Sequence, residues 1–490
     1  MKNFFAAVIF IFGLVTFSSA TAHDLDFDLS SGVEKILTCN GRKVKFIAYE
    51  NISYVANPVG DNQKLSVYIP AEYLRGETIN GYSAKNAPIF LPNGVGGYMP
   101  GKILEPVEND RMSGGANASL VALSRGLVVI SPAIRGRTTQ VDGVYIGKAP
   151  ALIVDYKAAV RWIRHNRDRL PAGDVEKIIS NGTSAGGALS ALLGATGNAP
   201  EYLPYLEKIG AADERDDIFA SSDYCPITNL DNADAAYEWI FCGVNEYFQA
   251  MWQMNPNARA EDANNPVAVK KASVMTAEEI RVSKILRDAF PAYVNSLKLR
   301  DEHGKLLTLD KNGNGSFKNF IKQKYVESAQ SALDGGADLS NVDWIKIRNG
   351  RVVDVDLKKY PASVTRMKAA PAFDKLDLSS GENDEFGTEK NSPRHFSTTL
   401  FNDNLADEKI IAMLNPMNFI GRVDVTTAKF FRIRHGAADR GTSLAIPAIL
   451  ALKLQNHGVN VNFFSPWARG HGGDYDLPEL FDWIDSVCKK

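Results

Sequence analysis

The segment Glu176 to Gly187 reads EKIISNGTSAGG and is the most informative part of this 490-residue chain. Its apolar half predicts a buried strand, and a helical pattern opens directly after Ser184. Between them, the match to G-x-S-x-G is typical of a tight turn that exposes a serine hydroxyl at a sheet edge. An ordinary turn between strand and helix is the competing interpretation, but the flanking elements favour a nucleophile. The segment indicates an α/β protein with a doubly wound sheet.

Strands and helices alternate on both sides of this segment, from about residue 45 onward. Near-continuous apolar runs predict buried strands, and apolar residues at helical spacing predict helices. Around the serine, the expected strands are 64–70, 87–92, 126–133 and 217–224, with a helix at 149–170. Nearer the C-terminus, the expected elements are strands 429–434 and 459–465 and helices 442–456 and 478–487. This rhythm predicts a sheet with helices on both faces.

The regular alternation of strands and helices is interrupted between residues 230 and 399. That region mixes helical patterns at 235–252 and 276–297 with polar loops and a hairpin pattern at 344–357. We therefore expect a catalytic domain formed by residues 23–229 and 400–490. An inserted cap, or lid, domain of residues 230–399 interrupts it.

A serine nucleophile needs a base and an orienting acid, which in this architecture follow in the order Ser, Asp or Glu, His. Of the seven histidines, His471 lies in a Gly-rich loop after the last predicted strand and is the expected base. Asp439 lies 32 residues earlier, an interval that holds one helix and one strand, and is the expected acid. Asp474 is a weaker alternative, and a solvated loop residue is the competing interpretation of Asp439.

Acyl transfer also needs hydrogen-bond donors for the oxyanion. The backbone N–H of Ala185, the residue after the nucleophile, is the first expected donor. The second should come from the loop after an early strand, and residues 93–98 (NGVGGY) occupy that place. A phosphate-binding loop is the alternative, but no Gly-Lys-Ser/Thr motif follows.

The first 22 residues combine Lys2, an apolar run from Phe4 to Phe17 and a small-residue site ending at Ala22. This pattern is typical of a secretory signal peptide. A membrane anchor is the alternative, but the apolar run is shorter than the roughly 20 residues that span a bilayer. We expect a protein exported to the periplasm or the cell exterior, without a stable membrane anchor.

The composition excludes two classes of protein. The chain has 55 Lys and Arg against 57 Asp and Glu, and it lacks the basic clusters that nucleic-acid partners require. Its 45% of hydrophobic residues is too high for a disordered chain. The four cysteines (Cys39, Cys225, Cys242 and Cys488) could form two disulfides, in any of three pairings.

Around the predicted triad, the chain resembles the bacterial tannases (tannin acyl hydrolases), which are serine esterases of the α/β-hydrolase fold with a large inserted cap domain. The resemblance runs through most of the chain after the signal peptide. Its motifs are NGVGGYMPG (93–101), IRGRTT (134–139), NGTSAGGA (181–188), YCP (224–226), AYEW (236–239), TRMK (365–368), RIRHGAADR (432–440) and GDYDL (473–477).

The resemblance implies Ser184, Asp439 and His471 as the catalytic triad and Gly97 as the residue of the oxyanion loop. It also implies that Lys368 and Glu382 hydrogen-bond the phenolic hydroxyls of a galloyl group. From the residues alone, those two would be solvated charges in a polar loop. No cofactor or metal is implied.

One position departs from the tannase pattern. The family places a second aspartate two residues after the catalytic one, as a further acceptor for galloyl hydroxyls, whereas this chain has Gly441. Loss of one charged hydrogen bond weakens discrimination by roughly 1.5–3 kcal/mol. Less hydroxylated acids, such as protocatechuoyl or feruloyl groups, then become possible substrates, unless Asp384 or Asp474 replaces the acceptor.

The sequence thus predicts an exported serine esterase whose partner is a small phenolic ester, with galloyl esters first. A feruloyl or related hydroxycinnamate esterase that uses the same catalytic residues is the nearest alternative. A non-catalytic binding module with a hydrolase fold is the alternative from another class, and it would be expected to carry a broken triad. A peptidase is disfavoured by the cap resemblance.

Overall fold

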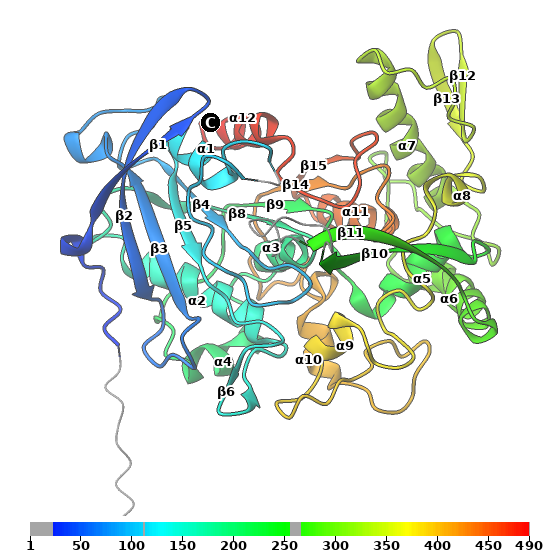
Figure 1. Cartoon of the computed structure of the whole chain (residues 1–490), viewed down its shortest axis with the longest axis horizontal. Coiled ribbons are helices and arrows are strands. Elements are labelled where there is room, and N and C mark those ends of the chain that lie inside the picture. The colour runs from blue at the N-terminus through cyan, green and yellow to red at the C-terminus, as the bar shows by residue number, and fades with distance from the viewer. Residues whose placement is uncertain (1–22, 111–112, 255–265, 490) are drawn as a thin grey trace, which may run out of the picture.

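The computed structural model describes residues 23–110, 113–254 and 266–489, but not the side chains of residues 249–271. Its centre is a nine-stranded sheet (Figure 1). In spatial order the strands are β1 (Val33–Cys39), β2 (Arg42–Ser53), β3 (Lys64–Pro70), β5 (Val128–Pro132), β4 (Pro88–Pro92), β8 (Asp174–Thr183), β9 (Ala220–Tyr224), β14 (Phe430–Arg434) and β15 (Asn460–Phe464). The strands from β5 to β15 run parallel, and β1, β2 and β3 join them antiparallel.

Helices cover both faces of the sheet, with α1 and α12 on one side and α2 and α4 on the other (Figure 1). The helices of the chain are α1 (Ala118–Ser124), α2 (Ala151–His165), α3 (Ala185–Ala195), α4 (Leu203–Lys208), α5 (Leu230–Phe241), α6 (Ala277–Ser296), α7 (Ser316–Asp334), α8 (Tyr360–Val364), α9 (Gly381–Glu385), α10 (Glu408–Met413), α11 (Ala445–Asn456) and α12 (Leu477–Cys488). Short 3₁₀ turns occur at Leu29–Ser31, Tyr73–Arg75, Pro200–Tyr202 and Pro416–Asn418. The doubly wound α/β fold expected from the sequence is confirmed.

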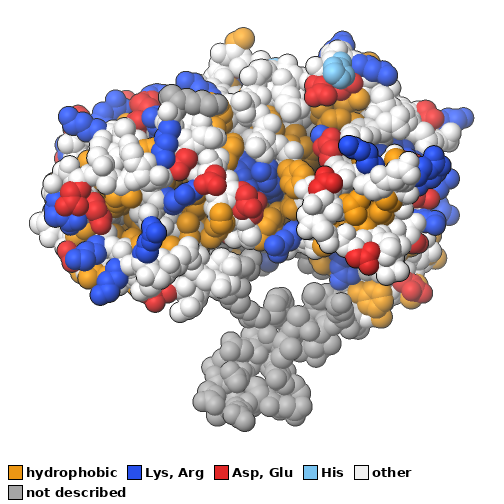
Figure 2. All heavy atoms as spheres, turned by 90° about the horizontal axis from the view of Figure 1, so that it is seen from above, with side chains coloured by type: hydrophobic (Ala, Val, Ile, Leu, Met, Phe, Trp, Pro, Cys, Tyr) orange, Lys and Arg blue, Asp and Glu red, His pale blue; other side chains and the backbone are white. Residues whose placement is uncertain are grey.

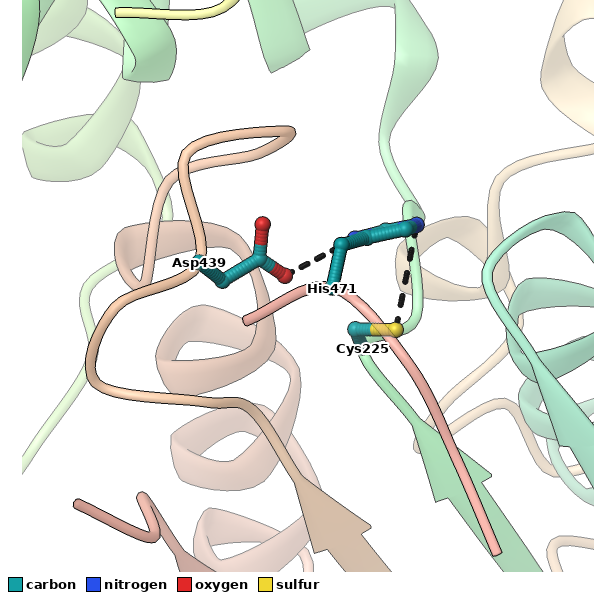
Figure 3. A group of neighbouring side chains, drawn as sticks. All are labelled: Cys225, Asp439 and His471. Atoms are coloured by element: carbon teal, nitrogen blue, oxygen red, sulfur yellow. Dashed lines mark hydrogen bonds and ion pairs between the residues drawn. The ribbon is translucent and has the colours of Figure 1, made fainter. Parts of the chain in front are cut away.

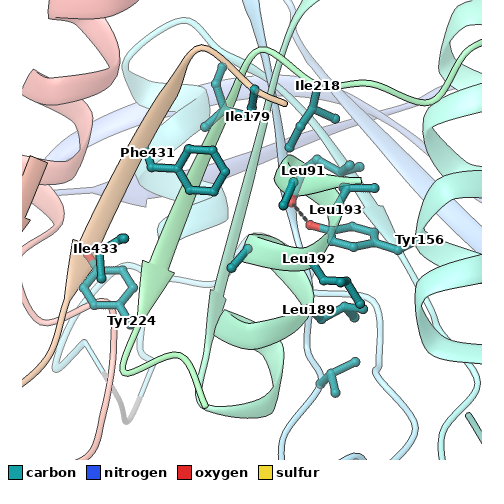
Figure 4. Packing of buried hydrophobic residues seen from close by; sticks show 14 of the residues in the cluster. Leu91, Tyr156, Ile179, Leu189, Leu192, Leu193, Ile218, Tyr224, Phe431 and Ile433 are labelled. Carbon is teal, nitrogen blue, oxygen red and sulfur yellow. Dashed lines mark hydrogen bonds between the residues drawn. The ribbon is translucent and has the colours of Figure 1, made fainter. Parts of the chain in front are cut away.

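Helix α3 is held rigidly because it is apolar on every side. Leu189, Leu192 and Leu193 pack beside Leu91 and Tyr156 in the buried core (Figure 4). The Tyr156 hydroxyl donates to the carbonyl of Leu91 at 2.5 Å, which ties α2 to β4. Each large apolar side chain buried in this way contributes about 1.5–3 kcal/mol. The residue at the N-terminus of α3 therefore has a fixed position relative to the sheet.

Residues 225–429 add no described strand to the central sheet. They contain α5 to α10 and two separate hairpins, β10 (Glu246–Met254) with β11 (Pro266–Val274) and β12 (Ile345–Arg348) with β13 (Arg351–Val355). A third small hairpin, β6 (Gln140–Val141) with β7 (Val144–Tyr145), lies earlier in the chain. The helix expected over 235–252 is wrong in its second half, where β10 pairs with β11.

The surface and the cysteines bear on two further expectations. Figure 2 shows acidic and basic side chains interspersed over one face, in keeping with the balanced charge. All four cysteines lie in the described part of the chain and none forms a disulfide.

The predicted signal peptide, residues 1–22, lies outside the described residues. Across the described ranges, no helix has both the length and the apolar character needed to cross a bilayer.

Candidate active site

Ser184 lies at a strained turn between β8 and α3. Its φ of 62° and ψ of −121° are unusual for a residue with a side chain, and such strain costs about 1–3 kcal/mol. The Ser184 N–H donates to the carbonyl of Tyr224 on β9 at 2.9 Å, which fixes the turn. A Cβ on Gly182 would lie 2.3 Å from the Gly186 carbonyl oxygen, and one on Gly187 would lie 2.4 Å from that of Tyr224. The turn therefore requires the glycines that flank the serine.

His471 and Asp439 complete a hydrogen-bonded chain with Ser184. The Nε2 atom of His471 lies 2.8 Å from the Ser184 Oγ, and its Nδ1 atom lies 2.8 Å from the Asp439 Oδ2. Asp439 follows β14 and His471 follows β15, so adjacent parallel strands deliver both residues to the carboxyl edge of the sheet. The structure thus brings together the three residues that the sequence predicted.

The Asp439 carboxylate is anchored on its other oxygen. Its Oδ1 accepts from the N–H groups of Gly441 at 2.7 Å and Thr442 at 3.4 Å, and the side chain is 1% exposed. Asp474, the alternative acid, accepts instead from the Asn181 side chain at 3.0 Å. Asp439 is therefore the carboxylate that orients the imidazole.

The charges of this pair support each other. Burial raises the pKa of Asp439, but the neighbouring His471 and His435 outweigh it and bring the pKa to about 2. Burial lowers the pKa of His471, but attraction to Asp439 and Cys225 outweighs it and holds the pKa well above the usual 6.5. His435 has its pKa lowered to about 4 by burial and stays neutral. Asp439 is thus ionised whenever the imidazole takes up a proton.

The two segments expected to supply the oxyanion donors pack against each other at the Ser184 turn. Ala185 is the first residue of α3, where N–H groups lack an acceptor within the helix. The loop containing Gly97 packs against the same turn, since a Cβ on Gly186 would lie 2.6 Å from the Val95 carbonyl oxygen. The Asn93 amide donates to the Gly186 carbonyl at 3.0 Å and locks the two segments together.

Arg137 fixes the Gly97 loop and was not singled out from the sequence. Gly97 has a φ of 53°, and its carbonyl accepts from the Arg137 Nε at 3.0 Å. The same guanidinium forms an ion pair with Asp384 at 2.7 Å, and Lys148 binds the other oxygen of that carboxylate. The only signal in the sequence was the position of Arg137 within the IRGRTT motif. Both oxygens of the Asp384 carboxylate are thus paired with cations.

Lys368 and Glu382 lie in the same region as the triad. Burial lowers the pKa of Lys368, while the negative charges of Glu382, Asp234 and Asp439 act against this. Lys368 is therefore close enough to Glu382 and to the triad acid to feel their charges. Its Nζ lies 3.9 Å from the centre of the Phe373 ring. Both Lys368 and Glu382 are half-buried and influence each other electrostatically, so they are not separate solvated charges.

The backbone at Lys368 is held by a buried ion pair that the sequence did not reveal. Arg366 donates to the Lys368 carbonyl at 2.7 Å and pairs with Glu238 on α5, with both charged groups fully buried. The Tyr237 hydroxyl donates to the Arg440 carbonyl at 2.8 Å. Helix α5 therefore connects the segment carrying Lys368 to the loop carrying Asp439. The charged residues of the AYEW and TRMK motifs were the available signal.

Comparison with solved structures identifies the family. The tannase of Fusobacterium nucleatum is 51% identical, with a TM-score of 0.89, and the alignment covers 95% of this chain and 99% of that one. A tannase from Lactobacillus plantarum is 44% identical, also with a TM-score of 0.89, over 95% of this chain and all of that one. The chain belongs to the tannase family. Tannases are carboxylic ester hydrolases, and the protein is one of them.

Two more distant similarities agree with this tannase assignment. The BD-FAE family model matches residues 108–270. Esterase LipQ of Mycobacterium tuberculosis is 29% identical over 168 residues, which are 31% of this chain. The match spans 38% of that esterase's length. Both fit a relation between tannases and feruloyl esterases.

Proposed function

We propose that the protein is an exported serine esterase that hydrolyses esters of gallate and related phenolic acids. The observation that carries this proposal is the hydrogen-bonded chain from Ser184 through His471 to the buried Asp439, with both distances at 2.8 Å. Each of these atoms is within the reach that general-base catalysis requires.

In the proposed reaction, the Ser184 Oγ attacks the ester carbonyl carbon while His471 Nε2 takes the hydroxyl proton. Asp439 stabilises the imidazolium through Nδ1. The N–H groups of Gly97 and Ala185 donate to the oxyanion. His471 then protonates the leaving alcohol, and a water molecule activated by the same imidazole releases the acid from Ser184.

Lys368 and Glu382 are proposed to hold the aromatic acid by its ring hydroxyls. An ammonium donates to phenolic oxygens and a carboxylate accepts from phenolic O–H groups, so the two residues recognise adjacent hydroxyls. Solved structures of a tannin acyl hydrolase in complex with ethyl gallate and with 3,4-dihydroxybenzoate support this choice of substrate. We propose that residues 230–399, which include Lys368 and Glu382, form a cap domain over the site.

A feruloyl-type esterase is the second candidate, and Gly441 is the observation that favours it. Asp384 is paired with Arg137 and Lys148, and Asp474 accepts from Asn181, so both acids that could replace the family's aspartate already have partners. An acyl ring with fewer hydroxyls then leaves fewer hydrogen bonds unmade at this position than a galloyl ring does.

Initial rates of purified protein on methyl gallate, methyl 3,4-dihydroxybenzoate and methyl ferulate test the proposal. We expect hydrolysis of the first two, abolished in Ser184→Ala. Activity on ferulate alone would establish the feruloyl candidate. Binding of gallate without hydrolysis of any of the esters would indicate a binding module. N-terminal sequencing of the protein from periplasmic and culture fractions tests export, with a mature chain starting at His23 as the expected result.

A further inference from the structure

Cys225 lies against the triad, although the proposed hydrolysis does not use it. The residue follows β9, where its N–H donates to the Arg434 carbonyl at 2.6 Å, and its side chain is buried. Its Sγ lies 3.8 Å from His471 Nε2 and donates to the Gly472 carbonyl at 3.5 Å. Figure 3 shows Cys225, His471 and Asp439 directed toward one another from three segments of the chain. A sulfur atom and the basic nitrogen of the triad therefore share one small space.

This group has the chemistry of a metal site. One ligand atom from each of Cys225, Asp439 and His471 lies within 4.8 Å of the other two. With Nδ1–H donating to Asp439, the lone pair of His471 Nε2 faces Cys225 as well as Ser184. A thiolate and a neutral imidazole are the ligands that Zn²⁺ and similar soft divalent cations favour.

The separation between the sulfur and nitrogen atoms suits tetrahedral zinc coordination. Zinc bonds of about 2.3 Å to sulfur and about 2.05 Å to nitrogen put the two ligand atoms about 3.6 Å apart. The observed separation is 3.8 Å, so a side-chain shift of a few tenths of an ångström suffices. The bond between His471 and Ser184 is exposed to solvent, which leaves a path for an ion and for water as a further ligand.

Asp439 supports His471 as a metal ligand by accepting a hydrogen bond from its other ring nitrogen. Histidines that bind metals usually donate their other ring N–H to a carboxylate, which fixes the ring and strengthens the ligand. Asp439 already makes this hydrogen bond to His471 Nδ1 at 2.8 Å. The arrangement that prepares His471 to act as a base also prepares it to bind a cation.

We propose that Cys225 Sγ and His471 Nε2, with Asp439 behind the imidazole, bind a zinc-type divalent cation, and that its binding reversibly inhibits the esterase. On binding, the Cys225 thiol releases its proton to solvent, as does the Nε2 atom of His471 where the imidazole is protonated. Bonds from the metal to sulfur and nitrogen form, and the hydrogen bond from Ser184 to His471 breaks. No electrons are transferred, and a chelator restores the starting state. The inhibition rests on the proposed function, whereas the binding does not.

The test uses the purified full-length chain with CoCl₂ as a spectroscopic probe and ZnCl₂ as the inhibitor. We expect cobalt to produce a sulfur-to-metal charge-transfer absorption, and zinc to abolish ester hydrolysis until EDTA is added. Cys225→Ala should lose the absorption. It should also need far more zinc for half-inhibition, beyond the roughly 10–100-fold that loss of an outer-shell partner causes. Inhibition is measured relative to each variant's own metal-free rate.

Cys242→Ala is the matched control, because Cys242 is the partly exposed cysteine and contacts Arg287 on α6 instead of the triad. This variant should keep both the absorption and the inhibition. Should Cys225→Ala misfold by circular dichroism, Cys225→Ser replaces it, with the same loss of absorption expected. Equal zinc sensitivity of wild type and the Cys225 variant, or an unchanged cobalt spectrum, overturns the proposal. A cobalt absorption that depends on Cys225 in a protein without esterase activity would keep the metal site and refute the proposed function.

Discussion

Arg366 and Glu238 form a fully buried ion pair across 128 residues of sequence. Removal of one member of such a pair leaves an uncompensated buried charge, which costs about 3–5 kcal/mol. We therefore expect Arg366→Met to lower the free energy of unfolding by that amount in urea titrations. Arg281→Ala, which breaks the exposed pair with Glu278, should leave it almost unchanged. Recovery in Arg366→Met with Glu238→Gln would show that the unpaired charge caused the loss.

Asp439 should be essential to the rate although it does not touch the ester. Asp439→Asn presents the wrong hydrogen-bond partner to His471 Nδ1, and kcat should fall about 10⁴-fold. Asp474→Asn is the control, because Asp474 binds Asn181 rather than the imidazole. If the two variants lost activity equally, the assignment of the triad acid would be wrong.

The pH dependence follows from the raised pKa of His471. Only the neutral imidazole accepts the Ser184 proton, so kcat/KM should rise with pH, with a midpoint above the usual histidine value of 6.5. Stability changes in the opposite direction. The attraction between His471 and Asp439 stabilises the fold fully below pH 6.5, and that contribution disappears as the pH rises through the folded pKa. A pH profile of kcat/KM with urea titrations at the same pH values measures both effects.

The lowered pKa of Asp439 sets the acid limit of stability. The carboxyl titrates near 3.8 in the unfolded chain and at about 2 in the fold, a difference that corresponds to about 2.5 kcal/mol. This contribution is present above pH 3.8 and is lost as the pH falls through about 2. The free energy of unfolding should therefore fall less steeply with acid in Asp439→Asn than in the wild type.

Lys368 should matter for phenolic acids and not for simple esters. Lys368→Met removes the ammonium but keeps the stem, and the loss of one charged hydrogen bond should lower kcat/KM on methyl gallate about 10- to 150-fold. Hydrolysis of p-nitrophenyl acetate, which has no hydroxyl on its acyl group, is the internal control and should change little. An equal fall on both substrates would indicate a structural role instead.

Gly441 should limit the selectivity for gallate. In Gly441→Asp, a restored acceptor should raise the ratio of kcat/KM on methyl gallate to that on methyl ferulate about tenfold or more. A Cβ there would lie 3.2 Å from Asp439 Oδ1 and 3.3 Å from His471 Cγ, so the triad must shift slightly. Gly441→Ala adds that Cβ without the acceptor and should leave the ratio unchanged. A ratio that rises in both variants would trace the effect to packing.

The parts of the fold that the sequence predicted are those encoded locally. The turn at Ser184 depends on glycines within three residues, and the central parallel strands are continuous apolar runs, so both can be read from short windows. Strand β1 has mostly exposed residues and gives no apolar alternation, which explains why this edge strand was missed. The run from Glu246 to Trp252 suits a helix or a strand, and its pairing with the distant β11 decides between them.

The residues of the candidate site also divide into those that local sequence predicts and those that depend on distant contacts. Ser184, Asp439 and His471 follow from the order of elements, because each lies just after a predicted strand of one parallel sheet. The buried pair of Arg366 and Glu238 joins two segments that no local pattern relates. Lys368 and Glu382 came from the family resemblance alone, since a charged residue in a polar loop carries no local signal of its surroundings.

The parallel pairing of β9 with β14 has a consequence for synthesis. Residues 225–429 separate these neighbouring strands, so the sheet is dominated at this point by contacts distant in sequence. Until β14 and β15 leave the ribosome, β9 remains an unpaired edge, and neither the acid nor the base of the triad has been made. A nascent chain therefore cannot hydrolyse esters before Asp439 and His471 have both been synthesised.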